Sequence, residues 1–230
     1  MAFAILKLSY NQPGDSSLTG GLCGSGFFVD SSMAITAHHV LNDATFMPNA
    51  GFRHTLLWLI PRSGATCRIE RSSVTLYPEI DTTVIRFPNS LSNVWIYEFG
   101  VGSLTDGMPV RGIGHVGNSM PSVDAEWQGI ELLVRSANLA GLTRDESGHV
   151  KRSVIFDINA NDIKMQGVRG FELSFGSQVG MSGGPVVDGD NGRVLGMLSI
   201  GLPPDSNVKT ETFAVSIDEI RQRCFGTGRG

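Results

Sequence analysis

Residues 24–40 read GSGFFVDSSMAITAHHV. Two short apolar runs, GFFVD at 26–30 and SMAIT at 32–36, are separated by a small polar residue, and the histidines His38 and His39 follow the second run. Short apolar runs bounded by Gly, Asp and Ser are typical of β-strands joined by tight turns. The segment therefore predicts two consecutive strands that end close to a pair of histidines.

The same pattern recurs along the whole chain. Thirteen runs of this kind are separated by clusters of Gly, Pro, Asn, Asp or Ser: FAILKL (3–8), GFFVD (26–30), SMAIT (32–36), TLLWLI (55–60), VTLY (74–77), TTVIRF (82–87), MPVRGIGHV (108–116), IELLVRSA (130–137), SVIFDI (153–158), FELSF (171–175), GPVVD (184–188), VLGMLSI (194–200) and TFAVSI (212–217). Glycine, with 29 of 230 residues, exceeds its usual share of about 7%, as expected of many tight turns. The pattern predicts an all-β sandwich or barrel.

A helix is predicted only at the end of the chain, in SIDEIRQRCF from Ser216. Ser216 is placed as its N-cap, and Glu219 three residues later completes the pattern of a capping box. Turn-forming residues at 86–107 separate two groups of strands, so we expect one domain at residues 1–97 and a second at 98–230. The polar stretch at 140–153 is expected to be an exposed loop of the second domain.

Charge and cysteine content exclude several classes of partner and site. The 18 Lys and Arg residues against 22 Asp and Glu residues give a net charge of −4 without a basic run, which argues against a nucleic-acid partner. No apolar stretch is long enough to span a membrane and no signal peptide is recognisable, so we expect a cytoplasmic protein, or a secreted one if Met1 replaces a removed signal. The three cysteines have no C-x-x-C spacing, and we expect free thiols.

The stretch with the most specific chemistry is GMSGGP at 180–185. A serine between glycines on a tight turn has an exposed Oγ, and the glycines let backbone N–H groups converge on one point. Ser182 is therefore a candidate nucleophile, and the amides of Gly180 and Ser182 are a candidate oxyanion hole. Taken alone, the stretch is better explained as a Gly-rich hairpin loop with a capping serine.

Together with GSGFFVD, TAHHV (36–40), IDTTVIRF (80–87) and GMLSIG (196–201), this stretch gives the chain a family resemblance. The chain resembles the trypsin-like, chymotrypsin-fold serine peptidases, most closely the disulfide-free HtrA (Deg) branch without a PDZ domain. The resemblance implies two packed six-stranded antiparallel β-barrels, a short C-terminal helix, a polypeptide substrate, and neither a metal nor an organic cofactor.

The resemblance also implies a catalytic triad. In the family motif T-A-x-H the fourth position is the base, which gives His39 and leaves His38 as a packing or hydrogen-bonding neighbour. Asp81 fits the family pattern of an aspartate that opens a strand, and the order His39, Asp81, Ser182 is that of chymotrypsin. We expect the first barrel to carry His39 and Asp81 and the second to carry Ser182.

The expected specificity pocket is apolar. By the same resemblance its floor is set six residues before the nucleophile, at Gly176, and its walls come from Ser199, Ile200, Gly201 and Ala214. Without a carboxylate at Gly176, cleavage is expected after apolar residues rather than after Lys or Arg. Glu211 lies close enough in sequence to the pocket wall to reverse this preference.

Three features of the sequence depart from the known patterns that they resemble. GIGHVG at 112–117 satisfies a dinucleotide-binding pattern, but no helix signature follows, so we interpret it as a strand and turn of the second barrel. Val40 stands where secreted relatives have a bridged cysteine. Met181 replaces the aspartate that orders the oxyanion loop in those relatives, so the loop is either already ordered or set by a regulatory partner, an oligomer or the substrate.

Two rival functions are open at this stage. The first is a protease-fold binding module without catalysis, and the second is an esterase or other acyl hydrolase with the same triad.

Overall fold

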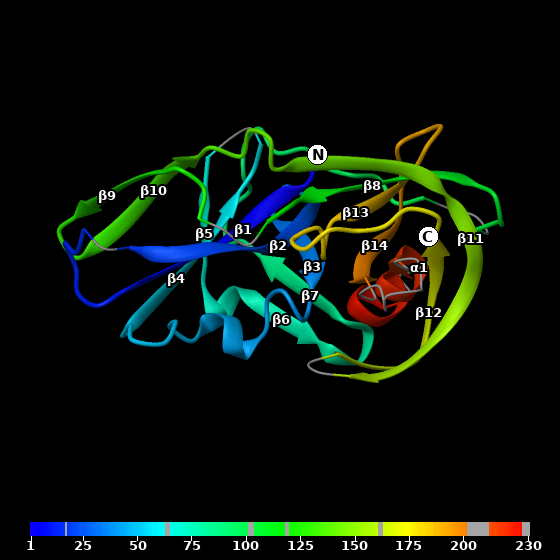
Figure 1. Cartoon of the computed structure of the whole chain (residues 1–230), viewed down its shortest axis with the longest axis horizontal. Coiled ribbons are helices and arrows are strands. Elements are labelled where there is room, and N and C mark those ends of the chain that lie inside the picture. Colours follow the sequence, from blue (N-terminus) through cyan, green and yellow to red (C-terminus); the bar gives the residue numbers. More distant parts are fainter. Residues whose placement is uncertain are drawn as a thin grey trace, which may run out of the picture.

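The computed structural model describes residues 1–16, 18–62, 65–100, 104–117, 120–160, 163–201 and 212–226, with the backbone alone at Ala160, Ile200 and Gly201. The described chain is built of β-strands with one short helix near its C-terminal end, and its two halves lie side by side (Figure 1). The predicted all-β fold of two packed β-structures is confirmed.

The first half is an antiparallel sheet in the order β5-β4-β1-β2-β3-β7-β6. Its strands are β1 (Phe3–Tyr10), β2 (Thr19–Asp30), β3 (Met33–Ala37), β4 (His54–Ile60), β5 (Cys67–Ile69), β6 (Val74–Tyr77) and β7 (Thr82–Arg86). This sheet has seven strands where six were expected. The additional strand, β5, is only three residues long and includes Arg68, so it carries no apolar run.

The second half contains a closed six-stranded barrel in the order β11-β12-β15-β14-β13-β8. Its strands are β8 (Pro109–His115), β11 (Thr143–Ala160), β12 (Ile163–Leu173), β13 (Pro185–Asp188), β14 (Val194–Gly201) and β15 (Thr212–Ser216). The interpretation of GIGHVG as part of a strand of the second barrel is confirmed, because β8 runs to His115, whereas the turn expected after it stays a prediction.

The expected loop at 140–153 is wrong, because β11 begins at Thr143 and pairs with β8 from Thr143 to His149. Its polar side chains lie on the outer surface of the barrel, where Asp145 and Arg111 form an ion pair. A polar run therefore continues as a strand because the backbone ladder, rather than burial of side chains, holds it in place.

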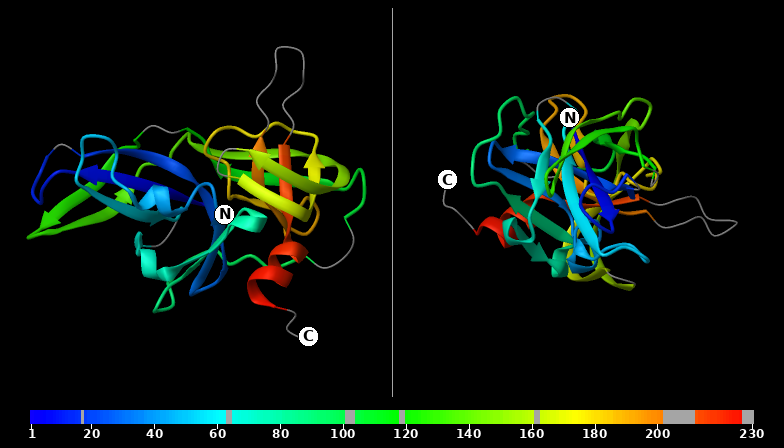
Figure 2. Two further views of the ribbon diagram at one scale, coloured as in Figure 1. Left: turned by 90° about the horizontal axis from the view of Figure 1, so that it is seen from below. Right: turned by 90° about the vertical axis from the view of Figure 1, so that its left-hand side faces the viewer.

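A separate hairpin leaves the barrel and packs on the first sheet. It consists of β9 (Val123–Gln128) and β10 (Glu131–Ala137). Leu132 and Val134 are buried against a set of apolar residues from β1, β2 and β4: Ala4, Leu6, Leu8, Leu22, Leu56, Trp58 and Ile60. Figure 2 shows the hairpin beside the strands of the first half. A segment of the expected second domain thus covers the first sheet, and the boundary at residues 97 and 98 stays a prediction.

The C-terminal helix joins both halves. Helix α1 (Ile217–Ile220) continues as a π-helical turn at Arg221–Phe225, and its apolar residues belong to the core cluster that both halves share. The N-cap prediction is confirmed, because the Ser216 side chain accepts a hydrogen bond from the Asp218 N–H. The Glu219 side chain pairs with Arg169 and Arg223, so its predicted part in a capping box is wrong.

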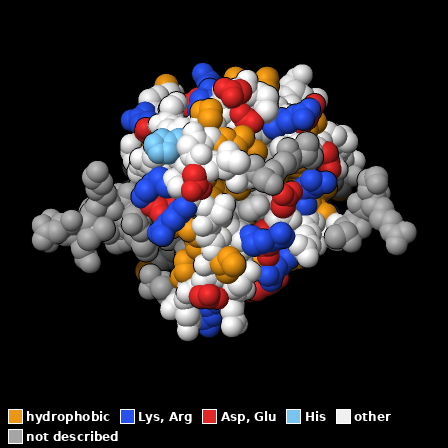
Figure 3. Space-filling view, turned by 90° about the vertical axis from the view of Figure 1, so that its right-hand side faces the viewer, with side chains coloured by type: hydrophobic (Ala, Val, Ile, Leu, Met, Phe, Trp, Pro, Cys, Tyr) orange, Lys and Arg blue, Asp and Glu red, His pale blue; other side chains and the backbone are white. Residues whose placement is uncertain are grey.

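The barrel end of the molecule carries basic and acidic side chains next to each other (Figure 3). Lys151 and Arg152 of β11 both form ion pairs with the buried Glu172 of β12. Among the described residues, no helix has the length and apolar character needed to cross a bilayer.

Candidate active site

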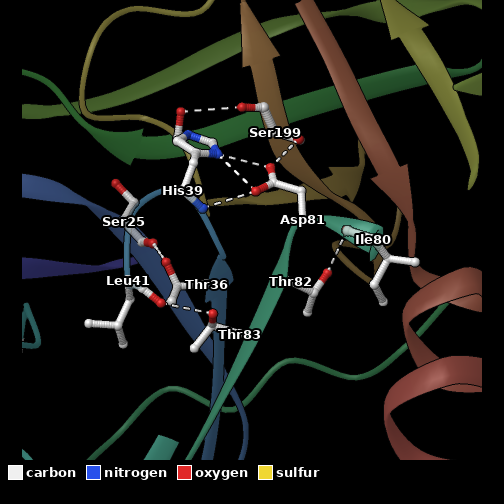
Figure 4. A network of polar contacts seen from close by, with 10 residues as sticks. Ser25, Thr36, His39, Leu41, Ile80, Asp81, Thr82, Thr83 and Ser199 are labelled. Carbon is white, nitrogen blue, oxygen red and sulfur yellow. Dashed lines mark hydrogen bonds and ion pairs between the residues drawn. The ribbon is translucent and has the colours of Figure 1, made fainter. Parts of the chain in front are cut away.

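His39 and Asp81 face each other in the first sheet. The Nδ1 atom of His39 lies 3.0 and 2.9 Å from the two carboxylate oxygens of Asp81, and the His39 backbone N–H donates to Oδ1 at 3.0 Å. Figure 4 shows these contacts of His39 with Asp81. Asp81 is fully buried and His39 is partly exposed. Because an ionised carboxylate only accepts hydrogen bonds, this contact assigns the proton to Nδ1 and leaves a lone pair on Nε2.

The backbone around Asp81 is shaped for this contact. Pro78 opens a 3-10 turn, Pro78–Ile80 (η3), which ends at Asp81 with φ of 48° and ψ of 42°. Aspartate is one of the few residues that tolerate this left-handed conformation. The conformation places the Asp81 carboxylate before β7, beside the turn that carries His39.

The two adjacent histidines have different surroundings. The backbone N–H of His38 donates to the carbonyl oxygen of Asp81 at 3.0 Å, whereas His39 contacts the carboxylate with its ring. The imidazole that Asp81 orients is therefore that of His39, the position expected from T-A-x-H.

Ser199 connects Asp81 to Ser182. The Ser199 hydroxyl on β14 donates to Asp81 Oδ2, and the Ser199 carbonyl oxygen accepts a hydrogen bond from Ser182 Oγ at 3.4 Å. One residue of the barrel thus contacts both the buried carboxylate and the candidate nucleophile. The sequence named Ser199 only as a pocket wall, and its hydroxyl contact with Asp81 was missed.

The loop before Ser182 is a tight turn. The Met181 N–H donates to the Gln178 carbonyl oxygen at 3.0 Å, and Gly180, the third residue of this turn, has φ of 97°. A Cβ atom at Gly180 would lie only 2.6 Å from the His115 carbonyl oxygen, so glycine is required by both conformation and space. Positive φ at the third residue is the signature of a type II turn.

Three further contacts fix the loop in place. The Ser25 backbone N–H and hydroxyl donate to the carbonyl oxygens of Ser182 and Gly180, and Thr36 Oγ1 donates to the Ser25 carbonyl oxygen. Ser25 and Thr36 lie in GSGFFVD and TAHHV, two motifs that carry the family resemblance. Neither motif by itself indicates a contact with the nucleophile loop.

The expected pocket residues lie in different environments. Gly176 is exposed, Ala214 is buried among apolar residues of the barrel, and Ser199 is buried beside Asp81. Ile200 and Gly201 are described by their backbone alone, within β14, and Glu211 lies outside the described residues. The apolar specificity of this pocket stays a prediction.

Two other expectations concern metals and thiols. Within the described ranges, no group of three or more His, Cys, Asp or Glu side chains is arranged to hold a metal ion. Cys23, Cys67 and Cys224 are free thiols, as expected. Burial raises the pKa of Cys23 to about 11, which keeps this thiol protonated and unreactive at neutral pH.

Comparison with known proteins adds a family match. A family model described as a trypsin-like peptidase domain matches residues 24–197. No curated protein matches the sequence.

Solved structures with the same fold are distant in sequence. The active form of the Rv3671c protease from M. tuberculosis aligns with a TM-score of 0.58 and 16% identity, over 98% of this chain and 81% of that chain. The inactive form of the same protease gives a TM-score of 0.59 and 16% identity, over 98% and 88%. The HtrA-type protease AlgW with a decapeptide gives a TM-score of 0.63 and 13% identity, over 98% of this chain and 65% of that chain. Likeness at this level of identity concerns the fold.

Proposed function

The chain belongs to the trypsin-like peptidase domain family, and from this we infer that it is a serine endopeptidase with Ser182, His39 and Asp81 as its catalytic triad. The observation that carries the proposal is the contact of His39 Nδ1 with the buried carboxylate of Asp81. Ser199 contacts both this carboxylate and Ser182. A polypeptide is the proposed substrate, in keeping with the decapeptide that accompanies AlgW in its solved structure.

In the proposed reaction, Ser182 Oγ attacks the carbonyl carbon of the scissile bond while His39 Nε2 takes the hydroxyl proton. Asp81 holds the Nδ1–H tautomer and stabilises the imidazolium that forms. The amides of Gly180 and Ser182 stabilise the negative charge on the carbonyl oxygen. His39 then gives its proton to the leaving amine, and water hydrolyses the acyl-enzyme by the same steps.

The availability of both amides supports this role. Neither the Gly180 N–H nor the Ser182 N–H donates a hydrogen bond to a group in the described parts of the chain. Because neither N–H is engaged by these residues, both can donate to a developing oxyanion. A binding module without catalysis would have no need for the buried Asp81 carboxylate that orients His39.

We propose, from the resemblance to the family, that cleavage follows apolar residues. Gly176 leaves the expected pocket floor without a carboxylate, and an unpaired Lys or Arg in an apolar pocket would lose its hydration without compensation.

The direct test is covalent labelling with a fluorophosphonate followed by peptide mapping. We expect the label on Ser182 alone, and Ser182→Ala should abolish both labelling and peptide cleavage. EDTA should leave the activity unchanged. Labelling that persists in Ser182→Ala, or strong inhibition by EDTA that zinc reverses, would contradict the proposal. Cleavage of ester substrates without any cleavage of a peptide library would favour the esterase.

A further inference from the structure

The nucleophile loop of the barrel is held by a residue of the first sheet. Ser25 lies on β2, is fully buried, and uses both its backbone and its side chain. Its N–H donates to the Ser182 carbonyl oxygen at 2.8 Å, and its hydroxyl donates to the Gly180 carbonyl oxygen at 2.8 Å. Both partners flank Met181, so one residue from the opposite sheet contacts the loop on each side of that methionine.

Ser25 is itself held rigidly. Its Oγ atom accepts a hydrogen bond from the His115 N–H at 2.8 Å, and its carbonyl oxygen accepts one from Thr36 Oγ1 at 2.6 Å. Figure 4 shows Ser25 and Thr36 next to each other in the first sheet. The hydroxyl therefore has a fixed direction, with one acceptor and one donor.

These contacts fix the two peptide planes that meet at Gly180. The Val179 carbonyl oxygen accepts from the Gly117 N–H at 2.9 Å, which sets the plane that contains the Gly180 N–H. Ser25 Oγ sets the next plane through the Gly180 carbonyl oxygen. Because a trans peptide is planar, with its C=O and N–H on opposite sides, the Gly117 contact fixes the direction of the Gly180 N–H, whereas Ser25 Oγ fixes the Gly180–Met181 peptide. The Ser25 N–H fixes the Ser182–Gly183 peptide through the Ser182 carbonyl oxygen, so the peptide that carries the Ser182 N–H lies between two planes that Ser25 holds.

Met181 anchors the same loop from within the barrel. Its side chain is fully buried in the barrel cluster, and its Cβ lies close to the backbone of Gly114. In secreted members of the family that the sequence resembles, an aspartate stands at this position, and its ion pair orders the loop. Here burial of the Met181 side chain holds the loop. The hydroxyl of Ser25 then supplies the directional contact that an apolar anchor lacks.

We propose that Ser25 is a positioning residue for the oxyanion hole, which from the opposite sheet holds the two peptides on either side of the Ser182 amide without touching the substrate. The inference rests on the proposed function, because it assigns Ser25 a role in stabilising the oxyanion formed by attack of Ser182. With Met181 before the nucleophile, the loop is then ordered by contacts within this chain.

The test compares Ser25→Ala with Ser9→Ala. Ser9 is a matched control because it is a buried serine of the same sheet, whose Oγ bonds Thr55 Oγ1 at 2.9 Å and accepts from the Asn49 N–H at 3.2 Å. We expect Ser25→Ala to lower kcat by roughly tenfold to a hundredfold with little change in KM, since the loss arises where the oxyanion develops. Ser9→Ala should leave kcat within about twofold, since it lies away from the reacting atoms.

Two inhibitors separate positioning from general damage. A peptide aldehyde forms a hemiacetal in which Ser182 Oγ bonds the aldehyde carbon, the carbonyl oxygen becomes the oxyanion and the hydroxyl proton passes to His39. The matching peptide alcohol, with CH2OH in place of the aldehyde, forms no such adduct and carries no negatively charged oxygen. In Ser25→Ala the affinity for the aldehyde should fall by the same factor as kcat, while the affinity for the alcohol stays unchanged. Partial unfolding would weaken the apparent affinity for both inhibitors by one common factor, so the difference between them reports on the oxyanion hole.

Equal losses for the aldehyde and the alcohol, or a Ser25→Ala enzyme that behaves like Ser9→Ala, would overturn the role of Ser25 alone. If the wild-type chain fails to react with the fluorophosphonate at Ser182, the proposed function falls and the inference falls with it. The labelling result therefore distinguishes the two failures.

Discussion

At the scale of single residues, the two ring nitrogens of His39 have different roles in the proposed reaction. Its Nδ1 atom contacts both oxygens of Asp81, so Nε2 is the nitrogen that takes the Ser182 proton in the proposed reaction. His38, one residue earlier, contributes its backbone N–H to the Asp81 carbonyl oxygen. The two histidines should therefore respond very differently to mutation.

We expect His39→Ala to lower kcat by about three orders of magnitude or more, because only binding and oxyanion stabilisation remain when the base of such a triad is lost. His38→Ala should cost far less, since the backbone contact is kept. Steady-state kinetics on a cleaved peptide measures both variants. Equal losses, or a larger loss for His38→Ala, would show that the base is assigned to the wrong histidine.

His115 gives a prediction for the pH dependence of stability. It is fully buried, with Nε2 bonded to the Ala2 carbonyl oxygen at 3.2 Å, and burial lowers the pKa of His115 below its usual range, with Arg62 adding to the effect. The unfolded chain therefore takes up a proton at higher pH than the folded chain does. The stability contributed by neutral His115 is present above pH ~6.5 and is lost as the pH falls toward its folded pKa.

The melting temperature of the wild type should accordingly fall more steeply from pH 7 to pH 5 than that of His115→Gln. Other groups titrate alike in both proteins, so the difference between the curves isolates His115. Parallel curves would mean that the protonation of His115 is not coupled to folding.

At the scale of elements, strands were predictable wherever a run of apolar residues is long enough to show its period. All thirteen apolar runs overlap strands of the structure, whereas β5 and β9 were missed. Strand β5 is only three residues long, and β9 alternates apolar and polar residues over six positions without a continuous apolar run. The polar first part of β11 was taken for a loop because it has no apolar pattern, and pairing of its backbone with β8 defines it as a strand.

The β9–β10 hairpin allows a test at this scale. Leu132, which is 2% exposed, packs on the first sheet, whereas Ile130 at the hairpin turn is 79% exposed. Leu132→Ala should destabilise the protein by about 2–5 kcal/mol through lost burial and a residual cavity. Ile130→Ala should stay within about 0.5 kcal/mol. Urea unfolding measures the loss in free energy of unfolding for both variants. Similar losses would mean that the hairpin does not contribute to the folded core.

At the scale of the whole molecule, the candidate site exists only where the two halves meet. His39 and Asp81 come from the first sheet, Ser182 from a barrel loop and Ser199 from a barrel strand. The cluster of apolar residues shared by both halves and the C-terminal helix keep this junction fixed.

Matched peptides with Leu, Val, Phe, Lys or Arg before the scissile bond test the apolar pocket. We expect the apolar residues to be preferred over Lys and Arg by roughly tenfold or more in kcat/KM, since no carboxylate in the expected pocket compensates the hydration that a buried cation loses. A dominant preference for Arg or Lys that disappears in Glu211→Gln would place a carboxylate in the pocket and contradict the prediction.

The sequence by itself determined the strand content, the family, the order of His39, Asp81 and Ser182, and the N-cap of the terminal helix. These features depend on local periodicity and on motifs a few residues long, which a single segment contains completely. The tertiary structure alone decided the contacts of Ser199 with Asp81, the docking of the β9–β10 hairpin and the bond from Ser25 to Gly180, which joins residues 155 positions apart. Such contacts follow from the register and packing of two sheets, because each partner gains its hydrogen bond or buried surface only when distant parts of the chain are brought together.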